Sequence, residues 1–260
     1  WRPLLELGGH VSLTNLLFYL SQNFDKLLLF LAIGRLKSGQ TMIGMYNLAY
    51  NLMMRPVFIV TTPVTGVMLP ALSRAAAHRD EFGRLAVAFY RLVAVALLPC
   101  GVGLWLVADD ATRIFAGPRW LEAEILLAAL APTILVQGFI NIVGSLLTGA
   151  GKSRALTIGA LAVALLQIQG HVAGALIGRW FLSENEPIAG AGIALGIASA
   201  YSFVLVFAVT VPYLIYAFRQ AGVPGRAVLR AIRPALLATS TMGLAVWATR
   251  QMLDAYGPWP

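Results

Sequence analysis

The chain has 260 residues, of which 59% are hydrophobic and 12% charged, and its formal net charge is +8. A soluble domain is about 45–50% apolar and about 25% charged, so this composition excludes a soluble globular domain of this size. The mean hydropathy of +0.78 instead predicts a membrane protein. The apolar residues occur in long runs, not in the alternating pattern of a transmembrane barrel. We therefore predict an all-α fold, a polytopic transmembrane helix bundle.

Seven apolar runs are long enough to cross a bilayer, because a membrane-spanning helix needs about 20 residues. They predict about seven helices, at about 8–33, 41–71, 85–108, 121–149, 154–181, 188–217 and, as an additional C-terminal helix, 228–253. Pro56, Pro63 and Pro132 fall inside these runs and predict kinks, since proline removes a helical hydrogen bond. The loops are too short to fold separately, so residues 1–260 are predicted to form a single transmembrane domain.

Basic residues are distributed unequally between the two ends of the predicted bundle. Eleven lie at the first end, namely Arg2, Arg74, Arg79, Arg84, Arg91, Lys152, Arg154, Arg219, Arg226, Arg230 and Arg233. Six lie at the second end, namely Arg35, Lys37, Arg113, Arg119, Arg179 and Arg250. Most of the acidic residues also lie at this second end. The positive-inside rule then predicts that residue 1 and the loops 72–84, 150–154 and 217–230 are cytoplasmic. The net charge is thereby explained by topology and anionic lipid headgroups, without nucleic acid.

Small residues recur at helical spacing in the fifth and sixth predicted helices. They are Gly170, Gly174 and Gly178, followed by Gly192 and Gly196. Such spacing lets two helices approach closely in lipid, and we expect packing within one bundle rather than dimerisation. The single cysteine, Cys100, is expected to be a small buried side chain. The chain starts at Trp1 without a signal-peptide pattern, and we expect a larger N-terminal part to precede it.

Polar residues inside the apolar runs are the best candidates for function, because each is costly in lipid unless it faces a partner or a wet cavity. The polar side of the first helix carries Thr14, Asn15, Ser21, Gln22, Asp25 and Lys26. The second helix has Asn47, Asn51 and Arg55 at a spacing of four residues, and the fourth has a stripe of Gln137, Asn141, Ser145 and Thr148. We expect these stripes to converge on a hydrated cavity, with Arg55, Asp25, Lys26, Asn47, Asn51, Gln137 and Asn141 as candidate substrate-binding residues.

Arg55 is the leading candidate, because a guanidinium near the middle of a span can bind a phosphate or carboxylate through two hydrogen bonds. The alternative is that Arg55 pairs with Asp25 as an internal strut. Lys26 can instead extend toward the outer surface. In the fifth helix Gln167 and His171 lie one turn apart, and we expect His171 to be a hydrogen-bonded interhelical residue rather than a proton carrier.

Two patterns resemble other kinds of site and are set aside. Gly151-Lys152-Ser153 ends like a phosphate-binding loop, but the position of that motif's first glycine is occupied by Leu146. The acidic pair Asp109 and Asp110 has no histidine nearby and is interpreted as part of a solvated loop at the outer surface. We therefore expect no metal, no cofactor and no catalytic residue.

Four segments, in order, resemble a known family. They are Asn-Phe-Asp-Lys-Leu-Leu at 23–28, Gly-Met-Tyr-Asn-Leu-Ala-Tyr at 44–50, Val-Met-Leu-Pro-Ala-Leu-Ser-Arg at 67–74, and Phe-Ala-Gly-Pro-Arg-Trp at 115–120 followed by Glu-Ala at 122–123. Together they resemble the polysaccharide transporter family of flippases (Wzx-type, lipopolysaccharide biosynthesis), within the multidrug/oligosaccharidyl-lipid/polysaccharide exporter superfamily. The resemblance covers residues 8–150.

This resemblance implies two six-helix lobes around a central cavity, with helix 8–33 as the first helix of the second lobe. The partners that it implies are a missing N-terminal lobe of the same protein, membrane lipids and other polysaccharide-assembly proteins. The implied function is to move an undecaprenyl-diphosphate-linked oligosaccharide, a unit of O-antigen, capsule or exopolysaccharide, across the bacterial inner membrane by alternating access. Arg55 lies where the family is mostly apolar, so either it is tuned to an anionic glycan or another stripe faces the cavity.

Two rival functions remain at this point. A multidrug cation antiporter of the same superfamily needs a carboxylate-rich cavity, and Asp25 is the one acid clearly inside a predicted span. A membrane-embedded glycan polymerase or ligase would carry a large outer loop with catalytic residues, and no predicted outer loop exceeds about a dozen residues. We therefore expect a transporter rather than an enzyme.

Overall fold

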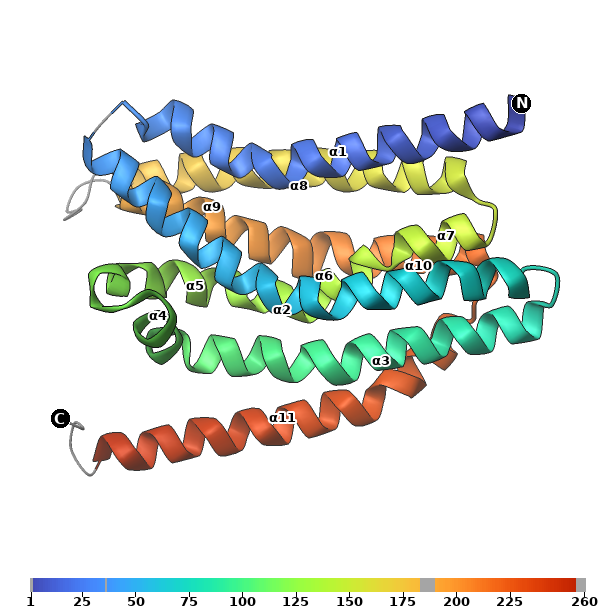
Figure 1. Ribbon diagram of the computed structural model, residues 1–260. Coiled ribbons are helices and arrows are strands. Elements are labelled where there is room, and N and C mark those ends of the chain that lie inside the picture. Colours follow the sequence, from blue (N-terminus) through green and yellow to red (C-terminus); the bar gives the residue numbers. More distant parts are fainter. Residues whose placement is uncertain (1, 36, 183–189, 256–260) are drawn as a thin grey trace.

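The computed structural model describes residues 2–35, 37–182 and 190–255, and these form helices and turns without a strand. Three long helices come first: α1 (Arg2–Ile33), α2 (Lys37–Ala75) and α3 (Arg79–Leu106). α2 contains Pro56, Pro63 and Pro70 yet continues through all three, and it bends part-way along its length (Figure 1). The all-α fold class predicted from hydropathy is confirmed.

The fourth crossing is interrupted. It consists of η1 (Pro118–Ala123), α5 (Glu124–Leu130), the 3₁₀ turn η2 (Ala131–Thr133), α6 (Ile134–Asn141) and α7 (Val143–Gly149). Pro132 lies in η2, so the interruption falls where the sequence predicts a kink, because proline cannot donate the next helical hydrogen bond.

A short helix that the sequence does not predict, α4 (Ala108–Ala116), occupies the expected outer loop before this crossing. Its buried face is formed by Ala108, Ala111 and Thr112, whereas Ile114 and Phe115 are exposed. Nine residues are too few to cross a bilayer, so a search for long apolar runs passes over such a helix.

The last three helical segments are α8 (Ser153–Leu182), the span α9–η3–α10, and α11 (Gly225–Ala255). The middle span joins α9 (Ala191–Phe203) to α10 (Thr210–Ala221) through a π-helical segment, η3 (Val204–Val209). The sixth predicted helix therefore matches over 191–217, and its first residues, 188–189, lie outside the described residues.

Within the described residues, six helical segments are long and apolar enough to span a membrane: 8–33, 39–75, 79–106, 118–149, 153–180 and 191–221. The prediction of a seventh membrane-spanning helix is corrected, because α11 is not among these six segments. Residues 228–253 do lie in a helix, α11, but it is less apolar than the other six. The physical reason is its composition, since Arg226, Arg230 and Arg233 occupy its first turns and Thr239, Ser240 and Thr241 its middle.

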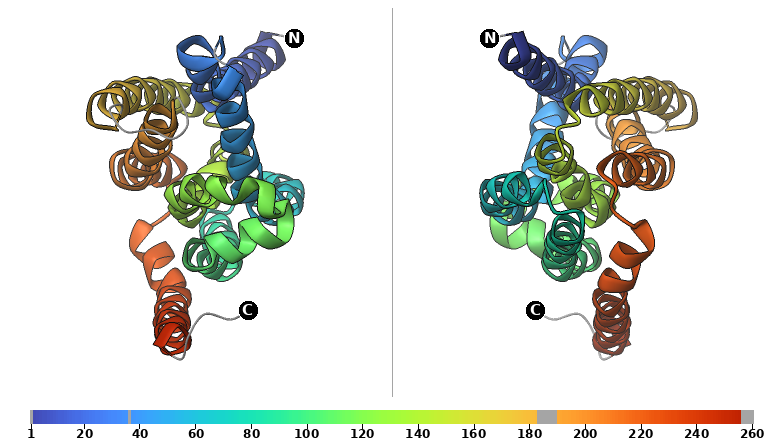
Figure 2. Two further views of the ribbon diagram at one scale, coloured as in Figure 1. Left: turned by 90° about the vertical axis from the view of Figure 1, so that its left-hand side faces the viewer. Right: turned by 90° about the vertical axis from the view of Figure 1, so that its right-hand side faces the viewer.

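The helices run roughly side by side, so their connections gather at two ends (Figure 1). The α2–α3, α7–α8 and α10–α11 turns share one end with the start of α1. The α1–α2 turn, α4 and the end of α11 share the other. This grouping of ends is the one deduced from the basic residues. α11 lies at the edge of the bundle and packs chiefly on α3 (Figure 2).

Glycines bring α8 and α9 into close contact, as their spacing predicts. A Cβ atom on Gly174 would overlap the carbonyl oxygen of Gly196, and one on Gly178 would overlap that of Gly192. The prediction for Cys100 is wrong, because this side chain is exposed. It lies in α3, directly after Pro99, where an apolar sequence marks a lipid-facing surface as well as it marks a core.

Candidate functional site: a polar cleft in the bundle

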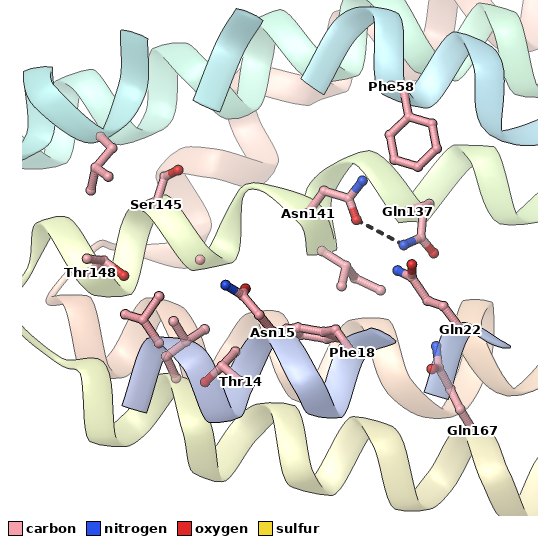
Figure 3. A pocket seen from close by; sticks show the side chains of 15 residues that line it. Thr14, Asn15, Phe18, Gln22, Phe58, Gln137, Asn141, Ser145, Thr148 and Gln167 are labelled. Atoms are coloured by element: carbon pink, nitrogen blue, oxygen red, sulfur yellow. Dashed lines mark hydrogen bonds between the residues drawn. The ribbon is translucent and has the colours of Figure 1, made fainter. Parts of the chain in front are cut away.

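A cleft of about 410 Å³ opens between α1, α2, α6, α7 and α8 (Figure 3). Its polar lining residues are Thr14, Asn15 and Gln22 from α1, Gln137, Asn141, Ser145 and Thr148 from α6 and α7, and Gln167 from α8. The polar side of the first helix and the stripe of the fourth crossing therefore converge, as the sequence predicts. Of the described residues that line this cleft, none is charged.

Hydrogen bonds hold one wall of the cleft in place. The Gln137 Nε2 amide donates to Asn141 Oδ1 at 2.9 Å, one turn along the same crossing (Figure 3). The Tyr201 hydroxyl donates to Gln137 Oε1 at 3.3 Å and so links α6 to α9. Gln137 is almost fully buried, whereas Asn141 is half-buried at the cleft. The pair presents an oriented amide surface, and its position is set by both crossings.

The opposite wall belongs to the contact between α1 and α8. Thr14 Oγ1 lies 3.1 Å from Thr157 Oγ1, and the Thr157 hydroxyl also lies 3.2 Å from His10 Nδ1. Gln167 lines the cleft further along α8, and its Oε1 atom is buried without a hydrogen-bond partner among the described residues. An unpaired buried acceptor in a polar cleft is available to a bound hydroxyl or water.

Asp25 and Lys26 lie next to the cleft but do not line it. The buried Asp25 Oδ2 accepts a hydrogen bond from the Tyr46 hydroxyl at 2.7 Å. Lys26 Nζ donates to Asn23 Oδ1 at 3.3 Å and lies 4.2 Å from the centre of the Tyr50 ring, a cation–π contact. The ammonium group of Lys26 is thus held by residues of α1 and α2.

Arg55 makes no ion pair with Asp25, and the partner of Asp25 is Tyr46. The alternative in which Arg55 pairs with Asp25 as an internal strut is therefore not found among the described residues. Arg55 and Asn51 are exposed and Asn47 is half-buried, so this stripe of α2 lies on the outside of the described bundle. Phe58, which lines the cleft, follows Arg55 by three residues and shares its face of the helix. Arg55 is therefore about one turn from the rim of the cleft.

Of the seven candidate residues, the cleft brings together Gln137 and Asn141, while the other five lie beside it or on the adjacent outer face. Whether any of them binds substrate stays a prediction. The aromatic lining residues Phe18 and Phe58 were not singled out from the sequence, although Phe58 continues the helical spacing of the Asn51–Arg55 stripe. Apolar residues between polar ones give no signal of their own in a membrane helix.

His171 differs from its prediction. Its ring is buried between two aromatic rings, 5.4 Å from that of Tyr201 and 6.4 Å from that of Phe24, centre to centre. Neither ring nitrogen has a hydrogen-bond partner among the described residues. The expected hydrogen bond is replaced by stacking, which hydropathy patterns do not reveal.

The fold and the cleft together define a multi-pass membrane protein with a polar interior. Residues 1–125 match the model of a family described as polysaccharide biosynthesis protein. The lipopolysaccharide biosynthesis protein WzxC of Escherichia coli K12 is 28% identical over 153 residues, which cover 58% of this chain and 30% of that protein. The teichuronic acid biosynthesis protein TuaB of Bacillus subtilis 168 is 27% identical over 152 residues, again 58% of this chain and 30% of that protein.

A membrane protein in the cps region of Klebsiella pneumoniae is 30% identical over 117 residues, covering 44% of this chain and 24% of that protein. The matched segment therefore spans less than a third of the length of each of these curated relatives. No solved structure matches the chain. The family match over residues 1–125 and these relatives confirm the resemblance to the polysaccharide transporter family seen in the four sequence segments.

Proposed function

We propose that this chain is part of a transporter that moves an undecaprenyl-diphosphate-linked oligosaccharide from the inner to the outer leaflet of the bacterial inner membrane. The observation that carries the proposal is the uncharged polar cleft inside an apolar bundle. Amide and hydroxyl side chains both donate and accept hydrogen bonds, which suits them to sugar hydroxyls. Burying so many polar groups within membrane helices is costly unless they serve a hydrated substrate path.

The diphosphate of such a substrate requires a cation, and Arg55 is the candidate. It is exposed on α2, about one turn from the Phe58 rim of the cleft, and no carboxylate among the described residues pairs with it. Its guanidinium is thus available for a bidentate contact to phosphate. In this proposal the face with Asn51 and Arg55 borders a second lobe, supplied by the additional length that the curated relatives possess.

A cation antiporter is less well supported by the same geometry. The lining of the cleft, as far as the described residues go, carries no carboxylate, and Asp25 is engaged by Tyr46 outside it. A hydrophobic cation would find neither a counter-charge nor an acidic cavity there.

Complementation tests the proposal. The complete natural protein is expressed in a strain that lacks its own glycan flippase and accumulates lipid-linked precursor. Recovery of surface polysaccharide together with loss of the accumulated precursor is the expected result. If no recovery occurs with any of several lipid-linked glycans of different charge, despite full membrane expression, the flippase proposal is wrong, and resistance to cationic drugs becomes the next measurement.

A further inference from the structure

A second, larger cavity lies between α11 and the rest of the bundle. It is a groove of about 980 Å³ lined by α3, α6, α10 and the first half of α11. Its floor is aromatic: the Tyr90 ring stacks on Phe139 at 6.1 Å and meets Phe218 edge-on at 4.9 Å. Aliphatic side chains such as Leu98, Leu214 and Ile232 complete the walls. The groove exists because α11 packs chiefly on α3 and makes few contacts with α10.

One end of this groove is basic. Arg219, in the last turn of α10, and Arg226, in the first turn of α11, both line it there. The helical rise of about 1.5 Å per residue gives the groove a length of about 20 Å along α11, from Arg226 to Ser240. That is close to one leaflet, since half of the hydrocarbon core of a bilayer is about 15 Å.

A smaller pocket of about 360 Å³ adjoins the basic end. It is formed where the α2–α3, α7–α8 and α10–α11 turns meet, and Arg79, Lys152 and Arg219 line it. These three cations make no ion pair with a carboxylate of the described residues. Arg219 lines both the basic pocket and the apolar groove, so the two cavities meet at its side chain.

We propose that the pocket and the groove together bind one anionic phospholipid of the leaflet at this end, with its phosphate at Arg219 and Arg226 and an acyl chain along the groove. The occupant must combine an anionic head with a long apolar tail, because a soluble anion would leave the groove empty and a lipid without net charge would bring no counter-charge to the basic end. The N-terminus of α11, at Gly225, adds its helix dipole to the attraction. The bound lipid then stabilises the packing of α11 on the bundle, along a face where contacts between helices are few.

Thermal unfolding of the complete natural protein in detergent tests this proposal. The probes are phosphatidylglycerol and phosphatidylcholine with identical acyl chains, and inorganic phosphate alone. A lipid that binds the folded state raises the midpoint in a concentration-dependent way. We expect phosphatidylglycerol to raise it more than phosphatidylcholine, and inorganic phosphate to have no comparable effect.

Charge reversal tests the head of the site. The double variant Arg219→Glu, Arg226→Glu should weaken the apparent affinity for phosphatidylglycerol about tenfold or more, since each basic group near the surface contributes to binding an anionic lipid. The matched control, Arg230→Glu with Arg233→Glu, changes the same charge on exposed positions of α11 that line neither cavity. It should leave the preference for phosphatidylglycerol intact.

Filling the groove tests the tail. Ile232→Trp places a larger ring in the groove, whereas Leu237→Trp makes a comparable change on an exposed part of α11 outside it. Only Ile232→Trp should abolish the rise in the unfolding midpoint that phosphatidylglycerol causes. Equal responses to the two lipids, an undiminished response in the Arg219, Arg226 variant, or an equal shift with inorganic phosphate would each overturn the proposal. Should either groove or charge variant fail to fold, mass spectrometry of the unaltered protein decides: retention of one phosphatidylglycerol per chain after washing supports the site, and its absence refutes it.

Discussion

The hydroxyl group of Tyr46 donates a hydrogen bond to Asp25 Oδ2 at 2.7 Å, within the contact between α1 and α2. Both side chains are buried, and Lys26 is the nearest cation in sequence. Asp25 is thus a fixed part of the helix contact rather than a group that reaches into the cleft.

Removing this hydroxyl should destabilise the protein. Tyr46→Phe leaves a buried carboxyl oxygen without its donor, and we expect a loss of about 1–3 kcal/mol in the free energy of unfolding. Tyr19→Phe makes the same chemical change on the exposed side of α1 and should be silent. Denaturant unfolding in detergent micelles compares the two. Equal stability of both variants would show that the Tyr46–Asp25 bond contributes little.

Arg55→Ala should abolish export in the complementation assay while leaving membrane insertion unchanged, because the residue is exposed and no contact of the described residues depends on it. Arg55→Lys keeps the charge but loses the bidentate geometry, so it should retain partial export. Surface glycan and membrane protein level are measured in the same cells. Normal surface glycan in Arg55→Ala would remove this residue from the mechanism.

Gly174→Leu should prevent α8 and α9 from packing. The new side chain would meet the Gly196 carbonyl oxygen and the Ala200 Cβ, and neither can move without shifting a helix. Overpacking of this kind costs about 1–3 kcal/mol or more. Gly66→Leu is the control, because no atom lies within 4 Å of a Cβ at that helical position. Folded yield from membranes and resistance to protease distinguish them; comparable yields would contradict the close approach.

The far end of α11 is fixed by charge. Arg250 donates to the Leu106 carbonyl oxygen and to Asp109, and contacts Asp110 at 3.4 Å. Partial burial raises the pKa of the Asp109 carboxyl, but the hydrogen bond and positive charge of Arg250 outweigh it, so the net pKa lies below the ordinary value of 3.8. Since the lowered pKa belongs to the folded state, this contact stabilises above the ordinary pKa and is lost as the pH falls through the lowered one.

Arg250→Ala should therefore loosen the end of α11 at neutral pH and remove the dependence of that end on acid. Hydrogen exchange of residues 245–255 measures it, with Arg113→Ala, an exposed residue of α4, as control. If the protection of these amides, corrected for the intrinsic pH dependence of exchange, is the same at pH 7 and at a pH well below the lowered pKa of Asp109, the ion pair does not hold this end.

The sidedness deduced from charge is tested by labelling. Cys100 is exposed and must first be replaced by alanine. Cysteine at position 74 or 79 should then react with a membrane-impermeant reagent only after the cells are opened, whereas cysteine at position 113 should react in intact cells. The reverse pattern would invert the topology.

Hydropathy was sufficient to predict six crossings, and charge the ends they share, because lipid penalises every unpaired polar group along a span. The same reasoning found the Gln137–Asn141 stripe of the cleft. For Arg55 it predicted only the face of α2 on which the side chain lies. Helical periodicity gives the direction of a side chain but not which neighbour it contacts. The stacking of His171 and the exposure of Cys100 depend on the positions of other helices, which no single-helix pattern contains.

The π-helical segment Val204–Val209 and the 3₁₀ turn Ala131–Thr133 pack against each other, and the Ser202 hydroxyl donates to the Ala129 carbonyl oxygen beside them. Both segments depart from the regular ladder of α-helical hydrogen bonds, which is where helices bend most easily. The most easily bent segments of two neighbouring crossings therefore lie side by side, along one line across the bundle. A tilt of the part near α4 against the part near Lys152 would be concentrated along that line, while the continuous helices α3 and α8 on either side keep their length.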